Sequence, residues 1–188
     1  MTHSLKIIIG STRPGRKGPV VAQWIDTVAR AHGAFDVSLV DLADMDLPLL
    51  DEPKHPAMQD YQHDHTKRWS AVIGEADAFI FVTPEYDFFA PASLVNAIQC
   101  LSREWKYKAA GVVSYGGISG GLRSMEVLRG LLVNQSVMPL AQSVPLPLFT
   151  NHITDDGRFD ANEKMVEGAN LMLDELVKWT GALKSLRG

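Results

Sequence analysis

The sequence opens with an apolar, β-branched run at residues 5–9 that ends abruptly in a loop rich in glycine, hydroxyl and guanidinium groups. Pro19 follows this loop, and its fixed φ angle suits the first turn of a helix. Over residues 20–28, apolar side chains recur at the spacing of one helix face. A strand joined to a helix by a short loop is the repeating unit of α/β proteins, so the segment predicts a fold of that class.

Apolar runs and helical patterns continue to alternate along the chain. Further strands are predicted at residues 35–42, 78–82 and 110–113, with a weak fifth strand within 137–144. Helices are predicted around 69–76, 91–101, 122–132 and 165–183. Asp160 and Glu163 have the spacing of a capping box before the last helix. Residues 43–58 contain Pro48, Pro53 and Pro56 and therefore predict a loop.

Five strands with intervening helices predict a doubly wound parallel sheet with helices on both faces. We expect the 188 residues to form one domain, a length that can bury a sizeable core. Ligands of such sheets bind beyond the carboxyl ends of the strands. Three loops of unusual composition leave those ends, at residues 10–18, 83–90 and 114–121.

Composition narrows the classes of partner. The formal net charge of −4 argues against binding to a nucleic-acid backbone, which needs a basic surface. No apolar stretch approaches the roughly 18 residues that span a bilayer, so we expect no membrane partner. The single cysteine, Cys100, excludes an internal disulfide and fits a cytoplasmic protein. Its neighbours Ile98 and Leu101 indicate a small buried side chain rather than a redox thiol.

The loop at residues 10–18 predicts a phosphate site. Backbone N–H groups at a helix start favour an anion, and Arg13 and Arg16 add charge-assisted hydrogen bonds. The spacing of Gly10 and Gly15 matches a P-loop, but an arginine replaces the lysine and no hydroxyl follows for magnesium. A kinase or ATPase is therefore excluded. Neither this loop nor residues 116–121 carry the dinucleotide fingerprint.

The other two loops describe the rest of the ligand. Tyr86 follows a buried strand and can lie along a flat ring. Phe88 and Phe89 line the same ligand, pack into the core or form a subunit interface. The glycine-rich residues 116–121 let the backbone approach a ligand closely and offer its N–H groups. A phosphate site, an aromatic wall and a backbone ledge together describe a flat heterocycle with one terminal phosphate, such as FMN.

Four motifs in order, at residues 10–16, 84–86, 94–98 and 114–117, resemble those of the NADPH-dependent FMN reductase family. The resemblance implies a flavodoxin-like fold with strand order 2-1-3-4-5. It also implies FMN as cofactor, NADPH or NADH as hydride donor, and a flavin, quinone, azo compound or similar small molecule as electron acceptor. Members of the family are homo-oligomers, usually dimers and sometimes tetramers.

Carried over position by position, the resemblance gives FMN-phosphate ligands in the first loop, ring contacts in the second, and contacts to the polar edge of the ring in the third. The candidate cofactor-binding residues are Ser11, Thr12, Arg13, Arg16, Gly18, Pro19, Val20, Pro84, Glu85, Tyr86, Asp87, Ser114, Gly116 and Gly117. The family usually has Asn at position 87, followed by Gly, His or Ser. Asp87 and Phe88 therefore leave the acceptor end of the pocket least defined.

We expect no catalytic side chain, because hydride transfer through FMN needs stacking and exclusion of water more than a general acid. We also expect no metal site: His63 and His65, two residues apart on a helix, would point to opposite sides. Two other functions stay open, a flavodoxin-like electron carrier and a non-catalytic FMN-binding or delivery protein. The arginine pair argues against the carrier, whose phosphate loops are usually rich in hydroxyls.

Overall fold

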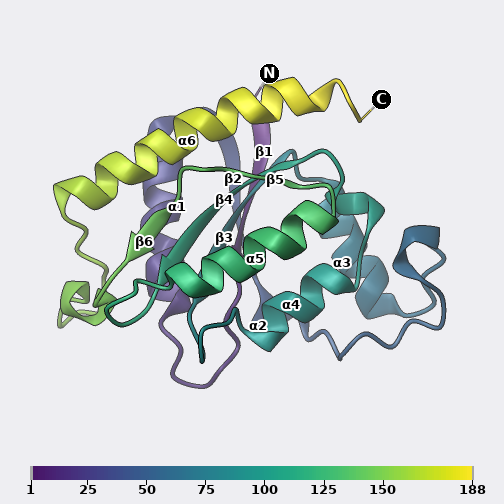
Figure 1. Cartoon of the computed structure of the whole chain (residues 1–188), viewed down its shortest axis with the longest axis horizontal. Coiled ribbons are helices and arrows are strands. Elements are labelled where there is room, and N and C mark those ends of the chain that lie inside the picture. Colours follow the sequence, from purple (N-terminus) through teal and green to yellow (C-terminus); the bar gives the residue numbers. More distant parts are fainter. Residues whose placement is uncertain (1, 188) are drawn as a thin grey trace.

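A parallel sheet with strand order β2-β1-β3-β4-β5 runs through the centre of the molecule (Figure 1). The computed structural model describes residues 2–187. Its strands are β1 (His3–Ile9), β2 (Phe35–Asp41), β3 (Ala78–Pro84), β4 (Ala109–Tyr115), β5 (Met138–Pro139) and β6 (Val144–Leu146). Every pairing between them is parallel. The flavodoxin-like order predicted from the resemblance is confirmed.

Helices cover both faces of this sheet. The α-helices are α1 (Gly18–His32), α2 (Leu42–Met45), α3 (Asp64–Gly74), α4 (Ala92–Gln99), α5 (Leu122–Asn134) and α6 (Glu163–Lys184). Residues 2–187 also form three short 3₁₀ helices: η1 (Pro56–Met58), η2 (Arg103–Trp105) and η3 (Phe149–His152). No helix within residues 2–187 is long and apolar enough to cross a membrane.

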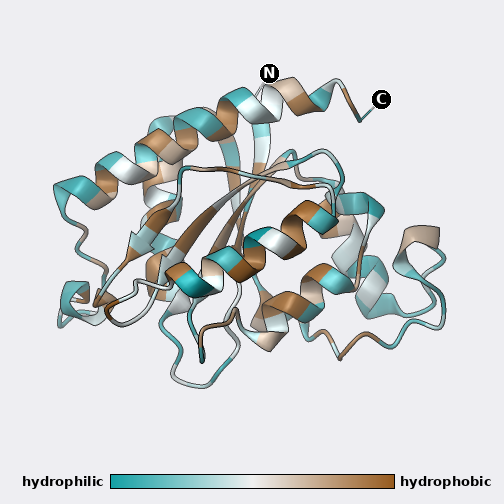
Figure 2. Ribbon diagram, viewed as in Figure 1, coloured by the Kyte–Doolittle hydropathy of each residue, from teal (hydrophilic) through white to brown (hydrophobic). Residues whose placement is uncertain are grey.

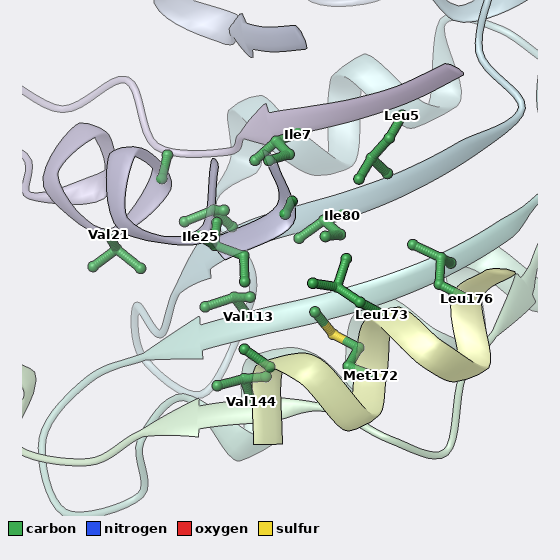
Figure 3. Close-up of a cluster of buried hydrophobic side chains, with 14 of the residues drawn as sticks. Leu5, Ile7, Val21, Ile25, Ile80, Val113, Val144, Met172, Leu173 and Leu176 are labelled. Atoms are coloured by element: carbon green, nitrogen blue, oxygen red, sulfur yellow. The ribbon is translucent and has the colours of Figure 1, made fainter. Parts of the chain in front are cut away.

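The core is divided into two clusters by the sheet. On one face, Ile7 of β1 packs with Ile25 of α1 and Met172 of α6 (Figure 3). On the other, Ile8 belongs to a cluster that includes Trp69 of α3 and other side chains of α4 and α5. Neighbouring residues of β1 thus face opposite helix layers, as the pleat of a strand requires. Figure 2 shows apolar residues concentrated on the central strands, while helices such as α6 mix apolar and polar residues.

The weak fifth strand is in fact two short strands. β5 pairs with the first residues of β4, and β6 pairs with its last three. Pro139 lies within the predicted span and has no N–H to donate, so a continuous strand over residues 137–144 would lose a ladder bond there. The sixth strand therefore extends the sheet beside the carboxyl end of β4, where the predicted strand would have ended.

Two local predictions are wrong. The last helix is capped by Asn162, whose Oδ1 accepts from the N–H of Met165 at 3.0 Å, and not by Asp160. Asp160 instead exchanges hydrogen bonds with His152 in the preceding loop. The predicted loop at residues 43–58 contains part of α2 and all of η1, because Asp41 and His55 cap these short turns.

His63 and His65 do not point to opposite sides. His63 precedes α3, so the helical spacing does not apply, and the two rings stack with centroids 5.2 Å apart. Nε2 of His65 lies 3.0 Å from Oδ1 of Asp51. Among residues 2–187, no three His, Cys, Asp or Glu side chains are grouped to hold a metal ion.

Candidate functional site

A pocket of about 410 Å³ opens beyond the carboxyl ends of β1, β3 and β4. We call it the carboxyl-end pocket. Its predicted lining residues are Arg13, Arg16, Pro84, Glu85, Tyr86, Gly116 and Gly117. Six further residues line the pocket that were not predicted to bind the cofactor: Gly15, Lys17, Tyr115, Leu148, Phe149 and Thr150. The volume lies in the range of small-molecule sites, and the location is the usual ligand position in a doubly wound sheet.

Two buried hydroxyl groups support the first loop. Ser11 is fully buried, and the hydroxyl of Tyr115 donates to its Oγ at 3.3 Å. A Cβ at Gly18 would lie 2.4 Å from this Oγ, so the start of α1 packs on Ser11 only because position 18 is glycine. Burial raises the pKa of Tyr115 to about 12, which keeps its phenol protonated. Ser11 thus positions the helix start and does not line the pocket.

The two arginines of this loop have different environments. Arg16 donates to both carboxylate oxygens of Asp41, at 2.8 and 2.6 Å, and to the carbonyl of Ser11 at 2.8 Å. The side chains of Arg16 and Asp41 are each only 17% exposed. Hydrogen bonding to Asp41 raises the pKa of Arg16. Its charge is compensated within the protein, and it fastens the loop to the end of β2.

Arg13 and Lys17 are the cations that remain available to an anion. Within residues 2–187, neither has a carboxylate at ion-pair distance, and the guanidinium of Arg13 lies 5.6 Å from the ring centroid of Tyr86. Lys17 is the N-cap of α1 and makes no side-chain capping bond. In the described part of the chain, the N–H groups of Gly15, Lys17 and Gly18 donate to no backbone carbonyl. Such an uncapped helix start beside two cations suits a phosphate.

The second loop is a tight hairpin turn. Tyr86 and Phe89 exchange both backbone hydrogen bonds at 2.9 Å, and Asp87 and Phe88 between them have φ of 48° and 70°. These angles are those of a type I′ turn, which places Asp87 at the tip, outside the pocket lining. Phe88 and Phe89 are 57% and 58% exposed, so they do not pack into the core.

Glu85 joins the second loop to the third. Its carboxylate accepts from Ser119 at 3.1 Å, and from the N–H and the Nε of Arg123 at 3.1 and 2.8 Å. Burial opposes ionisation, but the bonds from Arg123 and Ser119 outweigh it, and the pKa of Glu85 is lowered. The Arg123 guanidinium also stacks 3.8 Å from the ring centroid of Phe88. Glu85 is therefore an ionised, fully engaged anchor and not a proton donor.

The third loop needs glycine for its path. Gly121 has φ of 81°, and a Cβ there would lie 2.8 Å from the N of Tyr115. The buried Oγ of Ser114 donates to the carbonyl of Gly120 at 2.8 Å and holds the loop against β4. Gly117 differs, because a Cβ there would meet nothing within 4 Å. The open space next to Gly117 leaves room for a ligand against the backbone.

The remaining predicted residues lie around the pocket and not in its lining. Thr12 lines a separate hollow of about 240 Å³ with Ser93, and Val20 lines an apolar hollow beside Trp24. Pro19 is the second residue of α1. Ser11, Gly18 and Ser114 shape the backbone as described above. The wall formed by residues 148–150 was missed because it comes from the chain that follows β6, whose position the sequence did not reveal.

Comparison with known proteins gives one consistent result. A family model described as NADPH-dependent FMN reductase matches residues 4–151. An NAD(P)H-dependent FMN reductase of Schizosaccharomyces pombe is 34% identical, and the match covers 100% of this chain and 88% of the relative. An FMN-dependent NADPH-azoreductase of Staphylococcus saprophyticus is 29% identical over 92% of this chain and 93% of its own length.

Two other matches extend this result. A quinone reductase of Escherichia coli is 30% identical, with 71% of this chain and 72% of that protein covered. Among solved structures, a flavoenzyme NAD(P)H:(acceptor) oxidoreductase from Paracoccus denitrificans superposes with a TM-score of 0.76. The match covers 96% of this chain and 98% of that one at 20% identity, so it supports the fold alone.

Proposed function

The chain belongs to the NADPH-dependent FMN reductase family, and on that basis we propose that the carboxyl-end pocket holds FMN. The protein is an FMN-dependent NAD(P)H oxidoreductase. FMN, when bound, supplies the redox chemistry by taking a hydride from NADPH or NADH and passing two electrons to a small-molecule acceptor. The observation that carries the assignment of the pocket is the uncapped start of α1, flanked by two cations without carboxylate partners.

Arg13, Lys17 and the free N–H groups of the first loop would hold the phosphate. The charge of Arg16 is already compensated by Asp41, so Arg16 acts as a positioning residue that keeps the loop in shape. Ser11, bonded to the Tyr115 hydroxyl, has the same kind of role. This division assigns the charge-assisted bonds to the two cations whose donors are not engaged by the protein.

The ring end would lie between Tyr86 and the third loop. The N–H of Gly116 already donates to the carbonyl of Leu146, whereas within residues 2–187 the N–H of Gly117 donates to no backbone carbonyl. We therefore assign the polar edge of the ring to the Gly117 amide, which can stabilise negative charge there. Leu148 and Phe149 complete an apolar wall that excludes water from the ring.

Neither Glu85 nor Tyr115 is arranged to move a proton. Glu85 is ionised and bonded to Arg123, and the phenol of Tyr115 has a pKa of about 12 because it is buried. An acceptor that takes a hydride can take its second proton from solvent, so the pocket requires only binding and orientation of the reactants. Flavins, quinones and azo compounds, named for its relatives, are the acceptors we propose for this enzyme.

We further propose that residues 1–188 form one FMN-binding domain. We also propose that the protein is a cytoplasmic homodimer. Exposed apolar residues near the pocket, including Phe88, Phe89 and the 89%-exposed Ile118, support a surface that a second subunit covers.

Light scattering after size exclusion should report twice the chain mass. Phe88→Ser with Phe89→Ser should give monomers, whereas Leu49→Ser with Met58→Ser, also exposed but remote in sequence from the pocket, should not. A tetramer in the wild type, or a monomer, would contradict the dimer.

The enzymatic assignment is tested by titrating the flavin-free protein with FMN and then measuring NADPH and NADH oxidation without oxygen. We expect FMN to bind at one equivalent and turnover with a quinone, an azo dye or free FMN as acceptor. Bound FMN without turnover for any acceptor would favour an electron carrier or delivery protein. Failure to bind FMN would contradict the proposed site.

A further inference from the structure

A second hollow, also of about 410 Å³, lies at the opposite end of the same strands. We call it the amino-end pocket. Lys108, which lines it, directly precedes β4, and Gly74, also in the lining, is the last residue of α3. Arg187, which follows α6, also lines the pocket, and Figure 1 shows the C-terminal end of the chain beyond α6. The carboxyl-end pocket is lined by the last residue of β4, Tyr115, so the whole strand separates the two hollows.

The amino-end pocket is positively charged in a chain whose formal net charge is −4. Four cations line it, Arg103, Lys106, Lys108 and Arg187, against one carboxylate, Glu104. No carboxylate of the described residues lies at ion-pair distance from Arg103 or Lys106. Cations thus outnumber acids in the lining by four to one, and such an excess raises the local concentration of anions.

The one acid of the pocket is already engaged. The carboxylate of Glu104 accepts from the hydroxyls of Tyr61 and Ser70 at 2.9 and 2.7 Å, and from the N–H of Ser102 at 3.3 Å. Burial opposes its ionisation, yet these bonds lower the pKa of Glu104 below its ordinary value. Its oxygens are therefore bonded to neutral donors, and its single negative charge offsets only one of the four cations of the pocket.

Lys108 is a buried cation with one hydrogen-bond donor that the described residues do not use. Only 5% of the residue is exposed, and Nζ donates to the carbonyls of Ile73 and Gly74 at 2.7 and 3.2 Å. An ammonium has three hydrogens, so one remains. Burial, and then the nearby charge of Arg187, lower the pKa of Lys108 to about 8, although Asp77 and Glu104 oppose the shift. A bound anion would remove this like-charge penalty.

Arg187 offers a second set of donors. Its Nη1 lies 3.1 Å from Oδ1 of Asp77, whereas Nε and Nη2 are buried without a hydrogen-bond partner among the described residues. Nε and Nη2 form one edge of the guanidinium, the fork that binds an oxyanion through two parallel bonds. Buried donors without partners are costly, and an oxyanion is the group that satisfies such an edge.

We propose that the amino-end pocket binds a small organic anion through a phosphate or carboxylate group. The anionic group would lie between Lys108 and the free edge of Arg187, with Arg103 and Lys106 beside it. Two apolar side chains of the lining, Tyr107 and Leu186, are 43% and 58% exposed and would contact the remainder of the ligand. Tyr107 keeps φ of 58° while its N–H donates to the carbonyl of Ser136, which fixes the aromatic side chain at the rim. An aromatic phosphate should therefore bind more tightly than inorganic phosphate.

The test uses the FMN-loaded protein, so that FMN occupies the carboxyl-end pocket. Calorimetry at constant ionic strength compares inorganic phosphate with adenosine monophosphate, in the wild type and in Arg103→Ala with Lys106→Ala. Both replaced residues are exposed, so the fold should be spared. The matched control, Arg68→Ala with Lys164→Ala, removes the same charge from exposed positions outside both pockets.

We expect binding in the wild type and in the control, and binding weaker by about tenfold or more in the pocket variant. Phosphate should also raise the pH midpoint at which Lys108 Nζ titrates in a nitrogen-resolved NMR experiment. Equal binding in all three proteins would assign the anion to general surface charge and overturn the proposal. So would an unchanged Lys108 midpoint. Tighter binding of inorganic phosphate than of adenosine monophosphate would refute the apolar half of the site.

Discussion

Replacing Arg13 and Arg16 one at a time separates binding of the phosphate from support of the loop. The two residues lie three positions apart, and the resemblance implies that both bind the phosphate. In the structure only Arg16 is bonded, through Asp41 and the carbonyl of Ser11. We therefore expect Arg16→Ala to lower the stability of the flavin-free protein, and Arg13→Ala to lower FMN affinity alone.

The magnitudes follow from burial and bonding. Losing one partner of a fully buried ion pair costs about 3–5 kcal/mol, and an exposed pair contributes about 0–1 kcal/mol. Arg16 and Asp41 are each 17% exposed, and Asp41 keeps its bond from the N–H of Ala43. We expect the free energy of unfolding to fall by about 2–4 kcal/mol in Arg16→Ala. For exposed Arg13 the change should stay within about 0.5 kcal/mol.

For FMN the order of effects should be reversed. Loss of a hydrogen bond to a charged group costs about 1.5–3 kcal/mol, so Arg13→Ala should raise the FMN Kd by about 10- to 150-fold. Urea unfolding of the flavin-free protein measures stability, and quenching of FMN fluorescence measures Kd. Arg68→Ala, which removes an exposed charge elsewhere, should change neither. If Arg16→Ala left stability unchanged but weakened FMN binding, and Arg13→Ala did not weaken FMN binding, the roles assigned to the two arginines would be wrong.

Three further predictions concern the second and third loops. Gly117→Val should keep wild-type stability, because a Cβ there meets nothing within 4 Å, but should block FMN and remove fluorescence quenching. Gly121→Ala should lower the free energy of unfolding by about 1–3 kcal/mol in urea, because φ is 81° and the new Cβ would lie 2.8 Å from the N of Tyr115. Ionised Glu85, with its pKa lowered from 4.5, stabilises the fold at neutral pH, and this contribution is lost as pH falls through the lowered value. Glu85→Gln should therefore lose less stability than the wild type when urea unfolding is repeated below pH 4.5; an equal loss would contradict the ionised anchor.

Local patterns predicted much of the fold. The apolar runs predicted β3 and β4, which are buried along their whole length, and β1, which is buried over its last three residues. The resemblance predicted the strand order. The strands β5 and β6, which lie beside β4, could not be predicted in the same way. β5 and β6 are too short for a periodic pattern, and their places depend on pairing with the two ends of β4.

The site was predictable where residues act within their own loop. Tyr86 and Gly117 line the pocket, and each lies four residues after the end of a predicted strand. The partner of Arg16 was not predictable, since Asp41 is 25 positions away and meets it only when β1 and β2 pair. The wall around Phe149 depends in the same way on the path of the chain after β6.

The assignment of FMN to the carboxyl-end pocket is tested most directly by a crystal structure of the protein with FMN. We expect the phosphate at the start of α1, within hydrogen-bond distance of Arg13, Lys17 or the N–H of Gly18. The ring should lie against Tyr86, with its polar edge at the Gly117 amide. FMN bound elsewhere, for example in the amino-end pocket beside Lys108, or a phosphate bonded to Arg16 in place of Asp41, would contradict it.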